Sequence, residues 1–435
     1  MLIIGPYLVE TALWVIATLV ITVWATRGYL NAFFSIGLGR VKKKGRAAVA
    51  LAKRNPKPPF VTVLLPTFNE YAVVDRLLES VTGLDYPAYE IIVADDSTDG
   101  RTMARLAEWE RRGKVKVAHR NSRSGFKAGA LNRALGLSRR KGGYVLFFDA
   151  DYVPPPDIIW KMLADFSDGT ADAVQGYPDP SLNSSKSVLT RSVRVSSSYY
   201  CLVDIATRQR MRGFIPIFGS VFMIKRGVLE AVGGFDESSI TEDWALASRL
   251  AEEGYNVVFD EGISVPAECP TTLRSVMKQQ MRWAEGITRD TKNHLLRMLR
   301  SKKATPMKKF DYLFYGFSQF NSIFGTISYF VVALAIVINA GLLAGLPYDR
   351  ALILGGLGPF GQYALFVAPV YLPLAFIIGA LVAMHREGRI ADFPWCFTAL
   401  SMSLFLGPFV AFSSIKGLLT NKGSWSRTPK TGEVT

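Results

Sequence analysis

Five short motifs hold the residues of this chain whose types and spacing could do chemistry. In chain order they are Asp95-Asp96, Lys127 within Gly-Phe-Lys-Ala-Gly-Ala-Leu-Asn, Asp149-Ala150-Asp151, Thr241-Glu242-Asp243 and Gln279-Gln280-Met281-Arg282-Trp283. The set combines carboxylates, which can hold a cation or take a proton, with basic side chains, which can bind phosphate. Together they suggest a site for a phosphorylated ligand and a divalent cation.

Asp149 and Asp151 lie two positions apart, directly after the apolar run Tyr-Val-Leu-Phe-Phe, which is typical of a buried strand. Two carboxylates just past a strand end can offer oxygens to one hard cation, so we expect Mg²⁺ or Mn²⁺ to bridge them to a nucleotide diphosphate. Such a cation neutralises charge as a diphosphate leaves. The alternative is a solvated loop whose acids cap the helix predicted after Pro154-Pro155-Pro156-Asp157.

Other charged residues suit the rest of such a ligand. Lys127 lies in a glycine-containing loop that opens into a helix, and a helix N-terminus beside a lysine is a natural anion site. An ordinary surface lysine is the alternative. Asp95 and Asp96 end a predicted strand and could accept hydrogen bonds from a uracil N–H or a ribose hydroxyl, although the following turn could also use them. The same end of the domain is expected to include Pro66, Thr67 and Glu70.

Thr241-Glu242-Asp243 begins a predicted helix. Thr241 is a natural N-cap, and the two acids would meet the positive end of the helix dipole. An acid at this position, close to the predicted cation site, could also take a proton from an acceptor hydroxyl within hydrogen-bond reach.

Gln279, Arg282 and Trp283 lie on one predicted helix, at spacings of three and four that place them on the same side. Arg282 can pair with a diphosphate through two hydrogen bonds, and Trp283 can offer a sugar ring a flat apolar surface. The alternative is an amphipathic interface helix with its tryptophan at the level of the lipid headgroups.

Alternating strands and helices must position these motifs. Strand-like runs cover Phe60–Leu65, Glu90–Ala94, Lys114–Ala118 and Tyr144–Phe148. This alternation predicts a mostly parallel sheet with both faces covered, in which ligands bind beyond the carboxyl ends of the strands. The motif segments that follow three of the strands are therefore expected to meet at one edge of the sheet.

Composition points to a membrane protein. The 435 residues include 51 Lys and Arg against 36 Asp and Glu, which gives a net charge of +15, and 49% of them are hydrophobic. Basic residues cluster beside apolar segments, as expected for cytoplasmic anchors, and no nucleic-acid-binding motif accompanies the charge. Cys201, Cys269 and Cys396 have no metal-site spacing and suit a reducing cytosol.

Membrane-length segments run from Leu2 to Thr26 and roughly over Phe314–Leu346, Phe360–Met384 and Phe393–Leu419. Counting crossings places the C-terminal tail outside, whereas its basic residues favour the inside, so either a crossing is hidden or one segment is interfacial. We expect four or five spans. The expected divisions are a transmembrane anchor (1–28), a basic linker (29–59), a cytosolic α/β domain (60–292), an interfacial amphipathic helix (293–313), transmembrane helices (314–420) and a basic cytosolic tail (421–435).

In this order, between membrane-length segments, the five motifs resemble those of the processive family 2 glycosyltransferases, which include cellulose, chitin-oligosaccharide, hyaluronan and mannan synthases. The resemblance implies an α/β GT-A-type (Rossmann-like) domain plus an α-helical transmembrane region, in an integral plasma-membrane protein with a cytosolic catalytic domain. It also implies inverting transfer of a sugar from a nucleotide-sugar donor to a growing β-linked polysaccharide, with Mg²⁺ or Mn²⁺ as cofactor.

The resemblance assigns roles to individual residues. Asp243 is the general base beside Glu242, and Gly219-Ser220, where relatives often carry Gly-Thr, forms an acceptor site together with Trp283. An ordinary β-turn explains Gly219-Ser220 equally well. The tail from Trp425 resembles a closing segment of hyaluronan synthases. The residues implied to bind the nucleotide sugar and its metal are Pro66, Thr67, Glu70, Asp95 or Asp96, Lys127, Asp149, Asp151, Gln279, Arg282 and Trp283.

Substrate and product stay open at this point. UDP-glucose or UDP-N-acetylglucosamine is the first expectation for the donor, and GDP-mannose is the second. The product is either a β-linked glycan, passed through the membrane helices with a homo-oligomer enclosing the channel if needed, or a single sugar on a lipid. A catalytically silent membrane scaffold is a third hypothesis, against which the intact acids at every motif argue. The expected partners are the nucleotide sugar, a glycan or lipid acceptor, and membrane lipids.

Overall fold

The computed structural model of the chain describes residues 22–42, 57–138, 142–318, 368–421 and 427–435, together with positions 19, 50, 322, 323, 325, 326 and 423. Several sequence predictions fall outside the described residues: most of the segment Leu2–Thr26, most of Phe314–Leu346, the basic residues of 43–46 and 53–54, and the tail residues Lys422 and Trp425.

In the described part of the chain, seven strands form one sheet in the order β3-β2-β1-β4-β6-β5-β7. Strand β6 is antiparallel to its neighbours β4 and β5, and every other pair is parallel. The mostly parallel sheet predicted from the sequence is therefore confirmed. The strands are β1 (Val61–Thr67), β2 (Tyr89–Asp95), β3 (Lys116–His119), β4 (Tyr144–Phe147), β5 (Ala173–Asp179), β6 (Phe222–Lys225) and β7 (Val257–Pro266).

Both faces of the sheet are buried because successive side chains of a strand point to opposite faces. In β1, Val63 and Leu65 pack against α3 (Val74–Thr82), α4 (Gly100–Arg111) and α6 (Ile158–Asp165). Leu64 points to the other face and joins a separate core. That second core includes residues of α5 (Phe126–Gly136), α9 (Arg226–Ala231) and α10 (Glu242–Glu252).

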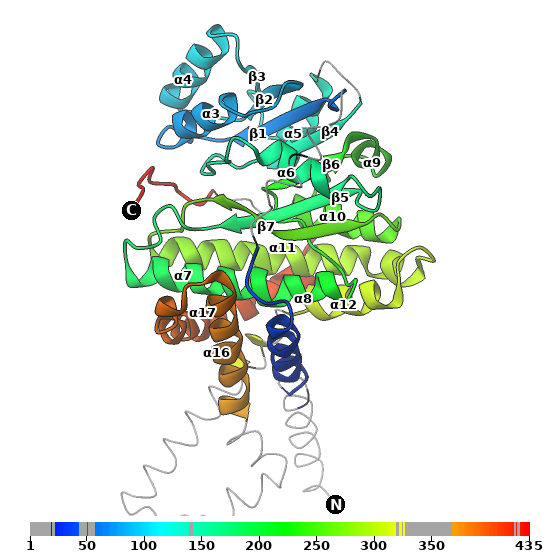
Figure 1. Cartoon of the computed structure of the whole chain (residues 1–435), viewed down its shortest axis with the longest axis vertical. Helices are drawn as coiled ribbons and strands as arrows, with labels where there is room; N and C mark the ends of the chain where they lie inside the picture. The colour runs from blue at the N-terminus through cyan, green and yellow to red at the C-terminus, as the bar shows by residue number, and fades with distance from the viewer. Residues whose placement is uncertain are drawn as a thin grey trace, which may run out of the picture.

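A layer of long helices lies across the lower side of the α/β domain (Figure 1). It contains α7 (Val188–Tyr199), which continues through the π-helix η1 (Tyr200–Ile205) into α8 (Ala206–Arg210), and it contains α11 (Leu273–Arg300) and α12 (Pro306–Gly316). The interfacial helix predicted over 293–313 is not a separate element. Its first part is the end of α11, which is 28 residues long, and its second part belongs to α12.

A helix over residues 22–36 and α16 (Ala368–Glu387) run side by side on the side of this layer away from the sheet (Figure 1). Their contact includes a hydrogen bond from the Tyr29 hydroxyl to the carbonyl of Tyr371 at 2.9 Å. After the short η2 (Ile390–Asp392), α17 (Trp395–Leu419) lies crosswise to α16 and packs along α7 and α11. Residues 370–387 of α16 and all of α17 are long and apolar enough to cross a membrane.

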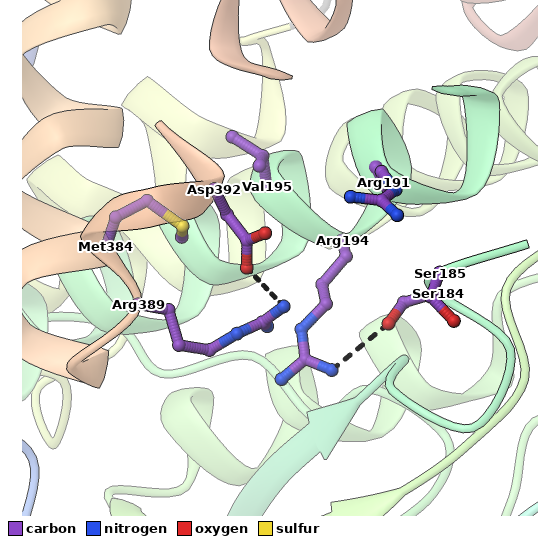
Figure 2. Close-up of a pocket in the computed structure, with 8 residues that line it drawn as sticks. All are labelled: Ser184, Ser185, Arg191, Arg194, Val195, Met384, Arg389 and Asp392. Atoms are coloured by element: carbon purple, nitrogen blue, oxygen red, sulfur yellow. Dashed lines mark hydrogen bonds and ion pairs between the residues drawn. The ribbon is translucent and has the colours of Figure 1, made fainter. Parts of the chain in front are cut away.

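Ion pairs join the α/β domain to the apolar helices. Arg194 of α7 lies 3.2 Å from Asp179 at the end of β5 and 2.9 Å from Glu387 at the end of α16. A cavity of about 40 Å³ lies beside it, with Ser184 and Arg389 on its wall. Figure 2 shows the Arg194 guanidinium pointing toward Ser184. Because one buried arginine contacts both a sheet strand and an apolar helix, these elements hold a fixed relation to each other.

Candidate active site

A cavity of about 650 Å³ lies at the carboxyl ends of the sheet strands and continues down between α7, α11 and α17. This position is the one predicted from the alternating pattern. The predicted site residues that line it are Pro66, Thr67, Glu70, Asp96, Lys127, Asp149, Asp151, Glu242, Asp243, Gln279, Arg282 and Trp283. Three other predicted residues, Asp95, Gly219 and Ser220, are not among the residues that line it.

The two neighbouring aspartates after β2 have different surroundings. Asp95 is 1% exposed, and its carboxylate accepts a hydrogen bond from the backbone N–H of Ser97 and contacts Nδ1 of His119 at 2.7 Å. Asp96 lines the cavity and pairs with Arg120 through two hydrogen bonds of 2.7 Å each. Sequence reasoning left the choice between them open, and of the two only Asp96, which is 4% exposed, is among the residues that line the cavity.

Lys127 lies at the start of α5, where Gly125 precedes the helix in a left-handed conformation. Its Nζ is 2.7 Å from Oδ1 of Asp149, 2.9 Å from the carbonyl oxygen of Gly219 and 3.4 Å from Oε1 of Glu242. Burial lowers the pKa of Lys127, but the carboxylates of Asp149 and Glu242 raise it by a larger amount. The net result is a pKa above the ordinary value of a lysine. The side chain is therefore an ammonium that points into the site.

Asp243 lies in the first turn of α10, beside Glu242. Burial raises its pKa, the Glu242 carboxylate raises it further, and the Lys127 ammonium opposes them, which gives a pKa of about 7. The capping bond predicted for Thr241 is not formed, and its hydroxyl donates to the buried Asp290 at 2.6 Å.

The turn at Gly219 brings several of these residues together. Gly219 has φ +73°, and a Cβ added there would lie 2.8 Å from Oδ2 of Asp243 and 3.2 Å from Nζ of Lys127. Ser220 is fully buried, and its hydroxyl oxygen accepts the backbone N–H of Asp149 at 2.9 Å. Two of the three residues predicted to contact an acceptor, Gly219 and Ser220, therefore adjoin Asp243, Lys127 and Asp149.

The helix α11 presents Gln279, Arg282 and Trp283 to the cavity from one side, as their spacing predicted. Burial lowers the pKa of Arg282, and the carboxylates of Glu242 and Asp243 oppose that shift. The Trp283 side chain is 40% exposed although it lies in a concave site. An exposed aromatic face in a cavity suits a ligand with an apolar surface, such as the C–H face of a sugar ring.

Sequence reasoning placed no site residue in the C-terminal tail, yet residues 427–435 cross the edge of the cavity. Lys430 Nζ lies 2.7 Å from Oδ2 of Asp151, and Arg427 lies 3.0 Å from Glu70. Burial raises the pKa of Glu70 to about 8, although Arg427 and Lys430 act in the opposite direction. No local pattern could have shown these contacts, because they join segments at opposite ends of the chain.

Sequence reasoning also did not predict the lower part of the cavity. Tyr200, the first residue of the π-helix η1, faces it, and its ring lies 5.7 Å from that of Phe218. Farther from the acids, α17 contributes the apolar side chains of Met402, Leu406 and Val410. The cavity thus joins a charged upper part to an apolar lower part between the helices.

Asp149 and Asp151, the two predicted cation ligands, both line the cavity. Among the described residues, no group of three or more His, Cys, Asp or Glu side chains is placed to hold a metal. A pair of carboxylates suits Mg²⁺ or Mn²⁺, which commonly take their other ligands from water and substrate phosphates. The ammonium groups of Lys127 and Lys430 lie 2.7 Å from these carboxylates, so the site already holds positive charge.

Comparison with known proteins identifies the class. The sequence family described as Glycosyltransferase like family 2 matches residues 58–286, which is more than half of the chain. The chain belongs to this family. The matched region includes all five motifs and ends within α11.

Among curated proteins, the chain is 29% identical over 268 residues to probable glucomannan 4-beta-mannosyltransferase 10 of Arabidopsis thaliana, covering 60% of this chain and 48% of that protein. It is 28% identical over 265 residues to glucomannan 4-beta-mannosyltransferase 1 of Oryza sativa subsp. japonica, covering 59% and 51%. The chain therefore spans about half the length of the curated relatives that it matches.

A solved structure shares the fold. The mannosyltransferase PcManGT from Pyrobaculum calidifontis, in complex with GDP-mannose and Mn²⁺, matches with a TM-score of 0.54 and 22% identity, covering 83% of this chain and 98% of that protein. The GT-A-type fold implied by the sequence motifs is thereby confirmed.

Proposed function

We propose that this chain is a metal-dependent, inverting glycosyltransferase that transfers mannose from GDP-mannose to an acceptor at a membrane. The observation that carries the proposal is the position of two charged groups beside Gly219. A Cβ added to this residue would lie 2.8 Å from the Asp243 carboxylate and 3.2 Å from the Lys127 ammonium. A proton acceptor and a phosphate-binding cation are both needed within reach of one reacting carbon.

In the proposed reaction, an acceptor hydroxyl attacks the anomeric carbon of the bound sugar from the side opposite the diphosphate. Asp243 takes the hydroxyl proton, the new glycosidic bond forms, and the bond to the diphosphate breaks. With a pKa of about 7, Asp243 is near the optimum for a general base at neutral pH. No covalent glycosyl-enzyme intermediate is required, so a second nucleophilic acid is not needed.

Basic residues receive the leaving diphosphate. Lys127 and Arg282 line the cavity beside the acids and supply fixed positive charge. A Mg²⁺ or Mn²⁺ ion held by Asp149 and Asp151 would supply further charge neutralisation as a Lewis acid. Glu242 holds Lys127 in place and, through its own charge, raises the pKa of the neighbouring base.

The relatives change the preferred donor. The sequence favoured UDP-glucose or UDP-N-acetylglucosamine, with GDP-mannose second. The curated relatives are glucomannan mannosyltransferases, and the similar solved structure is a mannosyltransferase with GDP-mannose. Both observations support GDP-mannose. Asp96, which lines the cavity while Asp95 does not, is proposed to contact the nucleotide base or its ribose.

The acceptor is proposed to be a growing β-linked glycan that lies along the cavity beside Trp283. A lipid-linked acceptor is the second candidate, favoured by the apolar lower cavity formed by Met402, Leu406 and Val410. Exposed apolar side chains on the residue 22–36 helix, α16 and α17 support an integral membrane protein. We propose that α17, which lies crosswise to α16, is an interfacial segment, which is one of the two alternatives that the charge pattern of the sequence left open.

Release of the nucleoside diphosphate tests the proposal. The purified protein in lipid nanodiscs is offered a panel of GDP- and UDP-sugars with Mn²⁺ or Mg²⁺, with Asp243→Asn as control. We expect release of GDP from GDP-mannose, abolished by a chelator and reduced at least a hundredfold in the variant. Product sizing then separates a glycan from a singly glycosylated lipid. Equal turnover by Asp243→Asn would overturn the assigned base, and turnover of a UDP-sugar alone would overturn the donor.

A further inference from the structure

Glu268 connects the C-terminal tail to the cation site through both its backbone and its side chain. It follows the end of β7 by two residues and is 5% exposed. Its backbone N–H donates to Oδ2 of Asp151 at 3.3 Å. Its carboxylate accepts the backbone N–H groups of Thr431 at 3.0 Å and Gly432 at 3.1 Å. One residue thus contacts a proposed metal ligand and the two tail residues that follow Lys430.

Lys430 closes this set of contacts into a ring, because its Nζ reaches the same Oδ2 of Asp151 at 2.7 Å. The buried Glu268 carboxylate is balanced by Arg76 of α3, which donates to it at 2.6 Å and also to the carbonyl of Gly432 at 3.2 Å. Since the peptide groups bound by Glu268 directly follow Lys430, the carboxylate sets the position from which the lysine reaches the site.

The tail turns sharply at this point. Gly432 has φ +77°, and a Cβ there would lie 2.5 Å from the carbonyl oxygen of Ala72, so the backbone passes too close for a side chain. Farther on, the N–H of Thr435 donates to the carbonyl of Leu182 at 2.7 Å. Hydrogen bonds therefore fix the tail against the domain. Glu268 is the buried charged group that binds the peptide groups directly after Lys430.

We propose that Glu268 is a positioning residue that holds the tail so that the Lys430 ammonium is available to the diphosphate of the donor. The inference rests on the proposed function, since it assigns the tail to the same site. Hydrogen bonds from peptide N–H groups to a buried carboxylate are among the stronger ones in proteins, so their loss detaches the tail from the domain. When the tail is detached, the diphosphate loses its contact with the Lys430 ammonium, and water enters the edge of the cavity.

A double-mutant cycle tests the inference in the full-length protein in nanodiscs. Affinity for GDP with Mn²⁺, with UDP measured in parallel, is compared in wild type, Glu268→Gln, Lys430→Met and the double variant. Each single substitution is expected to weaken binding about tenfold, and the double variant is expected to bind no more weakly than the weaker single one. Independent effects that multiply in the double variant would overturn the inference, as would unchanged binding by Glu268→Gln.

Trypsin provides a readout that a loss of folding or of metal binding alone would not imitate. Cleavage after Lys430 requires the tail to leave the domain, so release of residues 431–435 measures its detachment. We expect Glu268→Gln to speed this release at least fivefold while the α/β domain resists digestion. Glu261→Gln is the matched control, because Glu261 lies on β7, the strand that precedes Glu268, but pairs with Arg386 and not with the tail. Release at the wild-type rate in Glu268→Gln would contradict the inference.

The experiment also separates this inference from the proposed function. Asp243→Asn is expected to bind GDP and protect its tail as wild type does, while losing turnover. If no nucleotide binds to the wild-type protein, the proposed function fails. If nucleotide binds and turns over normally in Glu268→Gln, only the role of Glu268 fails.

Discussion

Lys430 and Asp151 form an ion pair of 2.7 Å across 279 positions of sequence, and it joins the C-terminal tail to the turn that follows β4. Asp151 is 2% exposed, so the pair lies inside the cavity and not on the surface. A buried carboxylate needs a cation, and the tail supplies one where a nucleotide diphosphate and its metal are proposed to bind. The tail residues Arg427, Thr428 and Lys430 thereby line the cavity that we propose to be the active site.

Lys430→Met should weaken use of the donor while leaving the fold intact. The substitution keeps the length and much of the volume of the side chain but removes a charge that we propose contacts the diphosphate. We expect the KM for the nucleotide sugar to rise about tenfold or more, because hydrogen bonds to charged groups contribute roughly 1.5–3 kcal/mol. Lys225→Met is the control, since Lys225 pairs with Asp172 and neither residue lines the cavity. A KM equal to that of wild type would exclude the contact.

Gly219→Ala should abolish activity through geometry alone. The added methyl group would lie 2.8 Å from the Asp243 carboxylate, on a backbone with φ +73° that disfavours alanine. We expect turnover to fall at least a hundredfold in a protein that still folds. Gly227→Ala is a matched control, because a Cβ there meets no atom within 4 Å and the backbone is unstrained. Similar activity in the two variants would show that the convergence at Gly219 does not matter.

The rate should depend on pH through Asp243. A general base must be deprotonated, so kcat/KM is expected to rise with pH up to about 7 and level off above it. In Glu242→Gln, removal of the neighbouring negative charge lowers the pKa of Asp243, so the rise should occur at lower pH. The measurement is a pH profile of GDP release for both proteins. A profile unchanged by the substitution would argue that another group titrates.

Stability should respond to the same residue with a predictable sign. The pKa of Asp243 is raised from 3.8 to about 7 in the folded state, so its protonation favours folding, and that contribution is lost as pH rises from about 4 through 7. Asparagine does not ionise, so Asp243→Asn avoids this loss of stability at high pH. We expect the variant to melt a few degrees higher than wild type at pH 8 and to show a smaller gain at pH 5.

Asp236→Asn is the control of opposite sign for this comparison. Burial raises the pKa of Asp236, but hydrogen bonds from Ser238 lower it more, so the net pKa lies below its ordinary value. Its charged form therefore favours folding, and the substitution should destabilise the protein more at pH 8 than at pH 5. Equal melting shifts of both variants at both pH values would show that neither carboxyl is perturbed as described.

Local pattern was enough to predict the mostly parallel sheet, its first four strands β1 to β4, and the edge of the sheet at which the motif residues line a cavity. Strand-like runs ending in acidic turns predict a parallel sheet with its acids at one edge, because a buried strand needs apolar side chains on both faces and a ligand-binding loop needs polar ones. Helical spacing likewise placed Gln279, Arg282 and Trp283 on one side of α11. These features depend on residues within a few positions of each other.

Tertiary structure alone decided what depends on distant contacts. The hydroxyl of Thr241 donates to Asp290 and makes no capping bond, and Asp96 lines the cavity while its neighbour Asp95 contacts His119. The tail enters the site because Glu268 binds its peptide groups. In each case several partners within reach compete for one polar group, and only the packing of segments far apart in the chain settles which of them it meets.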